Sequence, residues 1–133
     1  MARFPKKLGP FQVLSWFSAG LFLYLAALLL FFPASFLADL QVEGHASTYF
    51  VGRRVAMIFL GLAVVTYLGG RAPDSPARQA IALGMAVLML GLSIMGTYEL
   101  VRGFVGLAIL TAIVIELVIA ISYFWLWVRN RRR

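Results

Sequence analysis

The feature that most constrains this chain is a nearly unbroken apolar run close to its C-terminal end. The run covers residues 104–128, about 25 residues, and contains one acidic residue, Glu116. Crossing the hydrocarbon of a bilayer takes roughly 20 residues of α-helix, at about 1.5 Å per residue. The run therefore predicts a transmembrane helix with Glu116 near the bilayer midplane.

Composition extends this interpretation to the whole chain. Of its 133 residues, 62% are hydrophobic and 13% are charged, and the mean hydropathy is +0.92. Soluble globular domains are roughly 45–50% apolar and about 25% charged. We expect a single integral membrane domain over 1–133, because no interval between the apolar runs is long enough for a separate soluble domain.

Hydropathy places four membrane spans, at about residues 11–32, 54–69, 77–96 and 104–128. The first run exceeds the apolar core of a cleaved signal peptide, about 7–15 residues, so we expect it to be retained. Ser75 suits the N-cap of the third span, with Pro76 at its first helical position. The expected fold is an all-α membrane protein, a four-transmembrane-helix bundle.

A short helix should follow the first span. Pro33 suits its first turn, and Phe36, Leu37 and Leu40 would share one face, with Asp39 on the other. This pattern predicts about two turns lying in the membrane interface. A loop over residues 44–48 would lead to the second span.

Charge and aromatic residues predict the topology. With four spans the termini share a side, and that side carries nine of the 12 lysines and arginines. We expect the protein to lie in a bacterial inner membrane, and the positive-inside rule then places both termini on the cytoplasmic side. The aromatic belt expected on the inner side comprises Trp16, Tyr67, Tyr123, Trp125 and Trp127.

Glu116 is the main candidate for chemistry. A charged group at the bilayer centre costs on the order of 2.5–3.5 kcal/mol on insertion scales, so such residues face a bundle interior and find a partner. Glu116 would be a proton or cation site, a polar contact to a bound ligand, or a protonated acid that fixes packing through a hydrogen bond between helices. By depth, Tyr24 and Ser93 are the expected partners.

Four charged residues should gather at the outer ends of the spans: Arg53, Arg54, Glu99 and Arg102. They would form either an external site for an anion or lipid head group, or ion pairs between helix ends with the arginines reaching to the interface. At the other side, a polybasic tail follows the last span, consisting of Arg129, Arg131, Arg132 and Arg133. We expect it to anchor the chain to anionic membrane lipids, the alternative being docking onto an acidic partner.

The sequence offers few residues for a metal, catalytic or nucleic-acid site. There is no cysteine, and one histidine, His45, does not suffice for a multi-histidine metal site. Its neighbours Asp39, Glu43 and Ser47 lie in a loop, whereas a catalytic triad needs a rigid scaffold. We therefore expect no catalytic residues, metal, cofactor or nucleic-acid partner.

The order of features resembles an uncharacterised family of small bacterial proteins with four transmembrane helices. The matching features are Gly52-Arg53-Arg54, the turn from Arg71 to Pro76-x-Arg78, Gly96-x-x-Glu99 and Glu116. The family has no assigned activity, so the resemblance implies a fold and no mechanism.

Three functions remain open at this stage. The first is a non-enzymatic accessory or interaction subunit of a larger membrane complex, because small residues on several helices suit protein contacts. The second is a small, oligomeric proton-coupled transporter that uses Glu116. The third is a lipid- or quinone-binding protein that uses the outer arginines.

Overall fold

The computed structural model describes residues 7–132, and every regular element in that range is a helix. The helices are α1 (Pro10–Phe31), α2 (Pro33–Asp39), α3 (Ala46–Gly70), α4 (Pro76–Val101) and α5 (Ile109–Arg131). All except α2 are long and apolar enough to span a membrane. The predicted four-helix membrane fold is confirmed.

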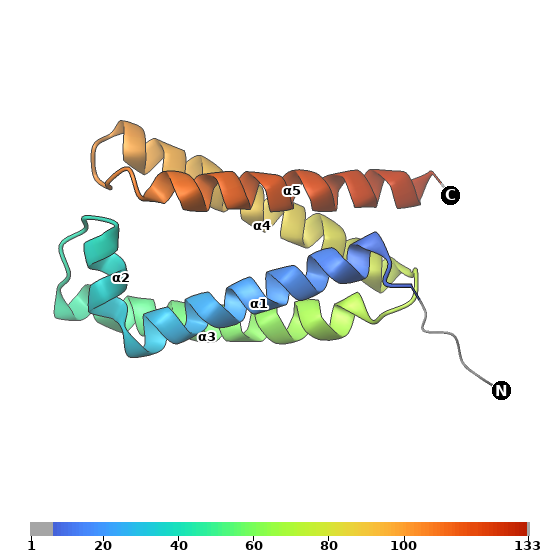
Figure 1. The fold of residues 1–133 in the computed structure, drawn as a ribbon, viewed down its shortest axis with the longest axis horizontal. Coiled ribbons are helices and arrows are strands. Elements are labelled where there is room, and N and C mark those ends of the chain that lie inside the picture. Colours follow the sequence, from blue (N-terminus) through green and yellow to red (C-terminus); the bar gives the residue numbers. More distant parts are fainter. Residues whose placement is uncertain (1–6, 133) are drawn as a thin grey trace.

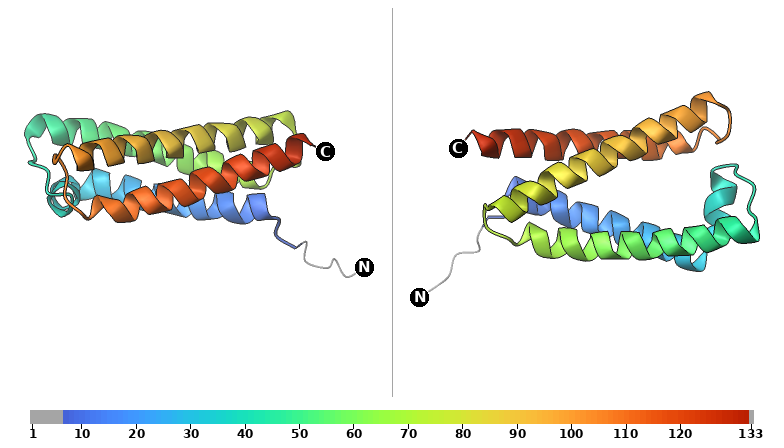
Figure 2. Two further views of the ribbon diagram at one scale, coloured as in Figure 1. Left: turned by 90° about the horizontal axis from the view of Figure 1, so that it is seen from above. Right: turned by 180° about the vertical axis from the view of Figure 1, so that it is seen from behind.

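The long helices pack as two pairs. Helix α1 lies along α3 and α4 lies along α5, while α1 and α5 connect the pairs (Figure 1). The two pairs meet at the end that holds the start of α1 and the end of α5, here called the termini end. They diverge toward the opposite end, the loop end, as Figure 2 shows from behind.

Side-chain packing explains why the pairs meet at the termini end. Phe11 at the start of α1 and Tyr123 near the end of α5 are fully buried, and their rings meet edge to face at 6.0 Å between centroids. Met85 and Met89 of α4 fill the same core. Such unbranched side chains suit irregular gaps between helices.

Helix α2 occupies the loop end. Its Phe36, Leu37 and the following Leu40 are partly buried and Asp39 is exposed, as the sequence pattern predicts. The backbone N–H of Gly106, in the α4–α5 connection, donates to the carbonyl of Leu40 at 2.9 Å. This bond ties the segment after α2 to the other helix pair.

Helix limits differ from the expected spans at three places. Helix α4 continues to Val101, beyond the expected end at residue 96. Helix α3 begins at Ala46, inside the expected loop over residues 44–48, because polar residues continue the helix beyond its apolar part. Helix α5 begins only at Ile109, after a turn in which Gly103 has a φ of 78°. The expected cap of α4 is confirmed, since the Ser75 hydroxyl accepts from the N–H of Arg78 at 3.3 Å.

Candidate functional site

Glu116 lies on the inward face of α5. Ile113, Ala120 and Tyr123 precede or follow it at helical spacings of three, four and seven residues, and all three are buried. Glu116 itself is only partly buried. Glu116 therefore lies on the side of α5 that faces the other helices.

Neither residue expected as a partner of Glu116 forms a hydrogen bond with it among the described residues. Tyr24, on α1, is 61% exposed and faces away from the core between the helices. Ser93 is buried in α4, where its carbonyl accepts from the Thr97 hydroxyl at 2.8 Å. Within residues 7–132, no hydrogen bond or ion pair joins Glu116 to either residue.

The four outer residues do not form one cluster. Arg102 pairs with Glu99 one turn earlier on α4, at 3.0 Å between Nη2 and Oε2. The guanidinium of Arg54 lies 5.9 Å from the ring of Phe50 on its own helix α3. Since α3 and α4 diverge toward this end (Figure 2), no contact among the described residues joins Arg53 or Arg54 to the Glu99–Arg102 pair.

The basic tail begins inside α5. Arg129 stacks over Trp125 with its guanidinium carbon 5.1 Å from the ring centroid, and Arg131 over Trp127 at 4.7 Å. Cations in the last turn also meet the negative end of the helix dipole. Arg132 is exposed, and Arg133 lies outside the described residues, as do Arg3 and Lys6 of the topology argument.

The structure reveals a buried polar cluster that the sequence analysis missed. The Tyr123 hydroxyl lies 3.1 Å from Oγ of Ser15 and 3.2 Å from Oγ of Ser18, and all three residues are fully buried. The Ser18 hydroxyl donates to the Leu14 carbonyl at 2.9 Å. The placement of Tyr123 in the aromatic belt was therefore wrong, because its ring faces α1 rather than the bilayer.

The feature of the sequence that could have predicted this cluster is the pair of serines in the first span. Ser15 and Ser18 are three residues apart and so share a helix face within an otherwise apolar span. Hydroxyls in such a position hydrogen-bond to a neighbouring helix. Tyr123 lies at the corresponding depth in the last span.

His45 takes part in no catalytic arrangement among the described residues. Its Nε2 lies 3.7 Å from Oε2 of Glu43, and both side chains are largely exposed. In residues 7–132, no group of three histidine, aspartate or glutamate side chains could hold a metal ion.

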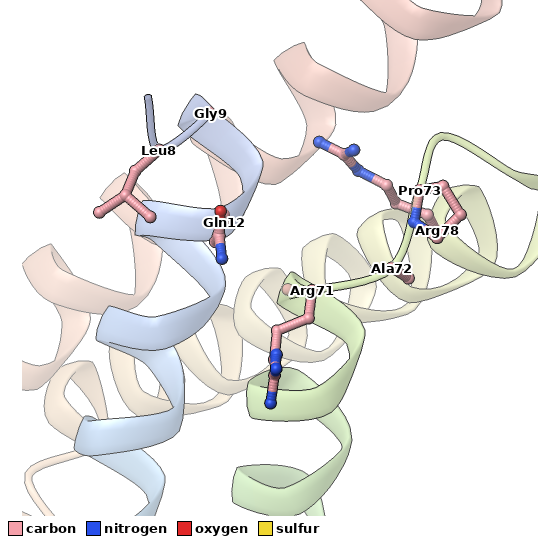
Figure 3. Close-up of a pocket in the computed structure, with 8 residues that line it drawn as sticks. Leu8, Gly9, Gln12, Arg71, Ala72, Pro73 and Arg78 are labelled. Carbon is pink, nitrogen blue, oxygen red and sulfur yellow. The ribbon is translucent and has the colours of Figure 1, made fainter. Parts of the chain in front are cut away.

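A basic pocket of about 560 Å³ opens at the termini end, between the start of α1 and the α3–α4 turn. Gln12, Arg71 and Arg78 supply its polar wall, and Gly70 and Pro73 are among its other lining residues. Figure 3 shows Arg71 directed back along α3, with Gln12 of α1 beside the same space and Arg78 entering from α4.

An apolar groove of about 500 Å³ lies farther along the same helix pair. The walls come from α1 and α3, with the following lining residues: Trp16, Ala19, Gly20, Leu23, Leu60, Ala63, Val64, Tyr67 and Leu68. The Trp16 indole N–H donates to the Tyr67 carbonyl at 3.2 Å and stacks on the Tyr67 ring at 5.8 Å. Neither the pocket nor the groove was predicted, because each depends on how two helices are rotated about their axes.

Comparison of the chain with protein-family models, with curated proteins and with solved structures gave no match.

Proposed function

We propose that this protein is a non-enzymatic accessory subunit of a larger complex in the bacterial inner membrane, with both termini in the cytoplasm. It would bind a protein partner within the bilayer through a face of α4. The excess of basic residues on the termini side supports the orientation.

The observation that carries the proposal is the uncovered face of α4. Gly84 and Gly91 are seven residues apart, and both have open space where a side chain would be. Val87 lies between them on that face and is 64% exposed. Helices in membranes associate where small residues let two backbones approach, since apolar side chains gain little by leaving lipid.

The opposite face of α4 already packs inside the molecule. Ala82, Met85, Ala86, Met89 and Ser93 are its buried residues. The two glycines are therefore not used by the fold itself. Their free face supports a contact with another helix.

The test is gentle extraction of the tagged protein from its own membrane, followed by native mass spectrometry. We expect a reproducible heteromeric partner, and we expect Gly84→Leu and Gly91→Leu to reduce its recovery. Gly61→Leu on α3 is the matched control, because Gly61 also has open space around its Cα. A monomer or a homo-oligomer as the only species would contradict the proposal.

A small proton-coupled transporter is the second candidate, and the inward position of Glu116 favours it. A carboxyl group at this depth, without an ionic partner among residues 7–132, suits reversible protonation. Glu116→Gln in proteoliposomes should abolish proton-coupled flux while leaving assembly unchanged. Equal flux in the two proteins would exclude this role.

The third possibility, a lipid or quinone site at Arg53, Arg54 and Arg102, gains no support from the contacts of these residues. Arg102 is paired with Glu99, and the two helix ends diverge.

A further inference from the structure

We infer that the α1/α3 seam binds one anionic phospholipid, with its phosphate in the basic pocket at Arg71 and an acyl chain in the apolar groove. The inference concerns a lipid ligand and is independent of the protein partner proposed above.

The pocket and the groove follow one another along the α1/α3 seam, with the stacked rings of Trp16 and Tyr67 at their junction. On α1, Gln12 lines the pocket and Trp16, Gly20 and Leu23 line the groove, at spacings of three or four residues. On α3, the groove residues Leu60, Val64 and Tyr67 lead to Arg71 of the pocket with the same spacing. Residues with this spacing share one face of a helix, so the basic pocket and the apolar groove lie on the same side of the α1–α3 pair and can contact one ligand.

The groove extends along much of one leaflet. Its α1 residues run from Trp16 to Leu23, over which the helix rises about 10 Å, at about 1.5 Å per residue. The hydrocarbon core of a bilayer is about 30 Å thick, so the groove spans about two thirds of one leaflet. A lipid whose head group lies at the termini end would place its acyl chain along the whole groove.

Charge identifies the head group. The residues lining the pocket include two arginines and no acidic residue. Arginine forms paired hydrogen bonds with phosphate oxygens, and the Gln12 amide lines the same pocket as Arg71. The Arg78 guanidinium also stacks over Phe11 at 4.2 Å, which fixes that wall of the pocket. Its Nε is buried and lacks a hydrogen-bond partner among the described residues.

The groove itself suits a single chain. Leu23, Val64 and Leu68 are each more than half exposed along its rim, whereas Ala19 and Ala63 form a buried floor. Gly20 has open space above its Cα, which deepens the groove at mid-length. Trp16 lies between the two parts, at the level where indole rings favour the head-group boundary.

The experiment is native mass spectrometry of the full chain titrated with phosphatidylglycerol or phosphatidylcholine of identical acyl chains. We expect one phosphatidylglycerol to bind preferentially. Arg71→Gln should weaken that binding about tenfold, the effect of losing one charge-assisted hydrogen bond. Arg132→Gln is the matched control, because it removes an exposed arginine from the same end without lining the pocket.

A second variant tests the acyl chain. Gly20→Leu should fill the groove and weaken phosphatidylglycerol binding without changing the charge. Val114→Phe on α5 adds similar bulk at a site that is 58% exposed and does not line the groove, so it should leave binding unchanged.

Three outcomes would overturn the inference. Equal losses for Arg71→Gln and Arg132→Gln would indicate diffuse attraction rather than a site. Equal binding of phosphatidylcholine and phosphatidylglycerol would show that the negative charge of the head group plays no role. Competition by glycerol phosphate, together with no effect of Gly20→Leu, would identify a free phosphate site without an acyl chain.

Discussion

At the residue scale, the bond network of Tyr123 connects the first and last spans. Tyr123→Phe removes only the hydroxyl that lies between Ser15 and Ser18, and keeps the ring against Phe11. Hydrogen bonds between membrane helices contribute about 0.6 kcal/mol on average and about 1.7 at most. We therefore expect the free energy of unfolding to fall by about 1 kcal/mol, as measured by titration with sodium dodecyl sulfate in mixed micelles.

Tyr24→Phe is the control for this change. It removes the same hydroxyl from a ring that is 61% exposed, so stability should not change. An equal effect of the two substitutions would show that the buried cluster contributes nothing specific.

At the scale of elements, the α1–α3 contact depends on Gly70. A Cβ at this position would lie 3.1 Å from both Cβ of Ser15 and Cδ1 of Trp16. Trp16 is held by its hydrogen bond and stacking to Tyr67, so it has little room to move. Gly70→Ala should destabilise the protein by about 1–3 kcal/mol, the usual cost of overpacking, as measured by the same titration.

Gly61→Ala provides the comparison on the same helix. Nothing lies within 4 Å of a Cβ added there. Its stability should match or exceed that of the unsubstituted protein, because alanine favours the helix. Equal destabilisation by both substitutions would contradict the close approach at Gly70.

At the scale of the whole molecule, the two helix pairs touch at the termini end and diverge toward the loop end. Spin labels report this directly, because the chain contains no cysteine that would react with them. Labels at Val13 and Phe124 mark the termini end of α1 and α5, and labels at Phe31 and Leu110 mark the loop end, all at exposed positions. Electron–electron distance measurements in nanodiscs should give a longer mean distance for the second pair.

Equal mean distances would indicate a closed bundle with parallel pairs. Labels at Leu23 and Val64, which both line the groove between α1 and α3, provide a reference distance within one helix pair.

What the sequence could predict follows from what it encodes locally. The long apolar runs and the Ser75-Pro76 cap are local signals, and the structure confirms them. The rotation of each helix about its axis is set by packing between distant segments. Depth alone therefore suggested Tyr24 as a partner of Glu116 and a belt position for Tyr123, although Tyr24 faces outward and Tyr123 faces inward.

The outer arginines also show that depth in the membrane does not predict which helices lie side by side. Arg54 and Arg102 lie at the same predicted depth, but their helices belong to different pairs that separate at this end. The proposed lipid path is the converse case, because it arises only where the faces of α1 and α3 are placed side by side.

The pairing of helices also sets an order of events during biosynthesis. The α1–α3 pair is complete in sequence before α4 leaves the ribosome, so its packing and its groove can form while the second half is still being translated. The contacts of Tyr123 with Ser15 and Ser18 span more than 100 residues of sequence and must form last. Docking of the two pairs through these contacts therefore has to wait until α5 has been synthesised.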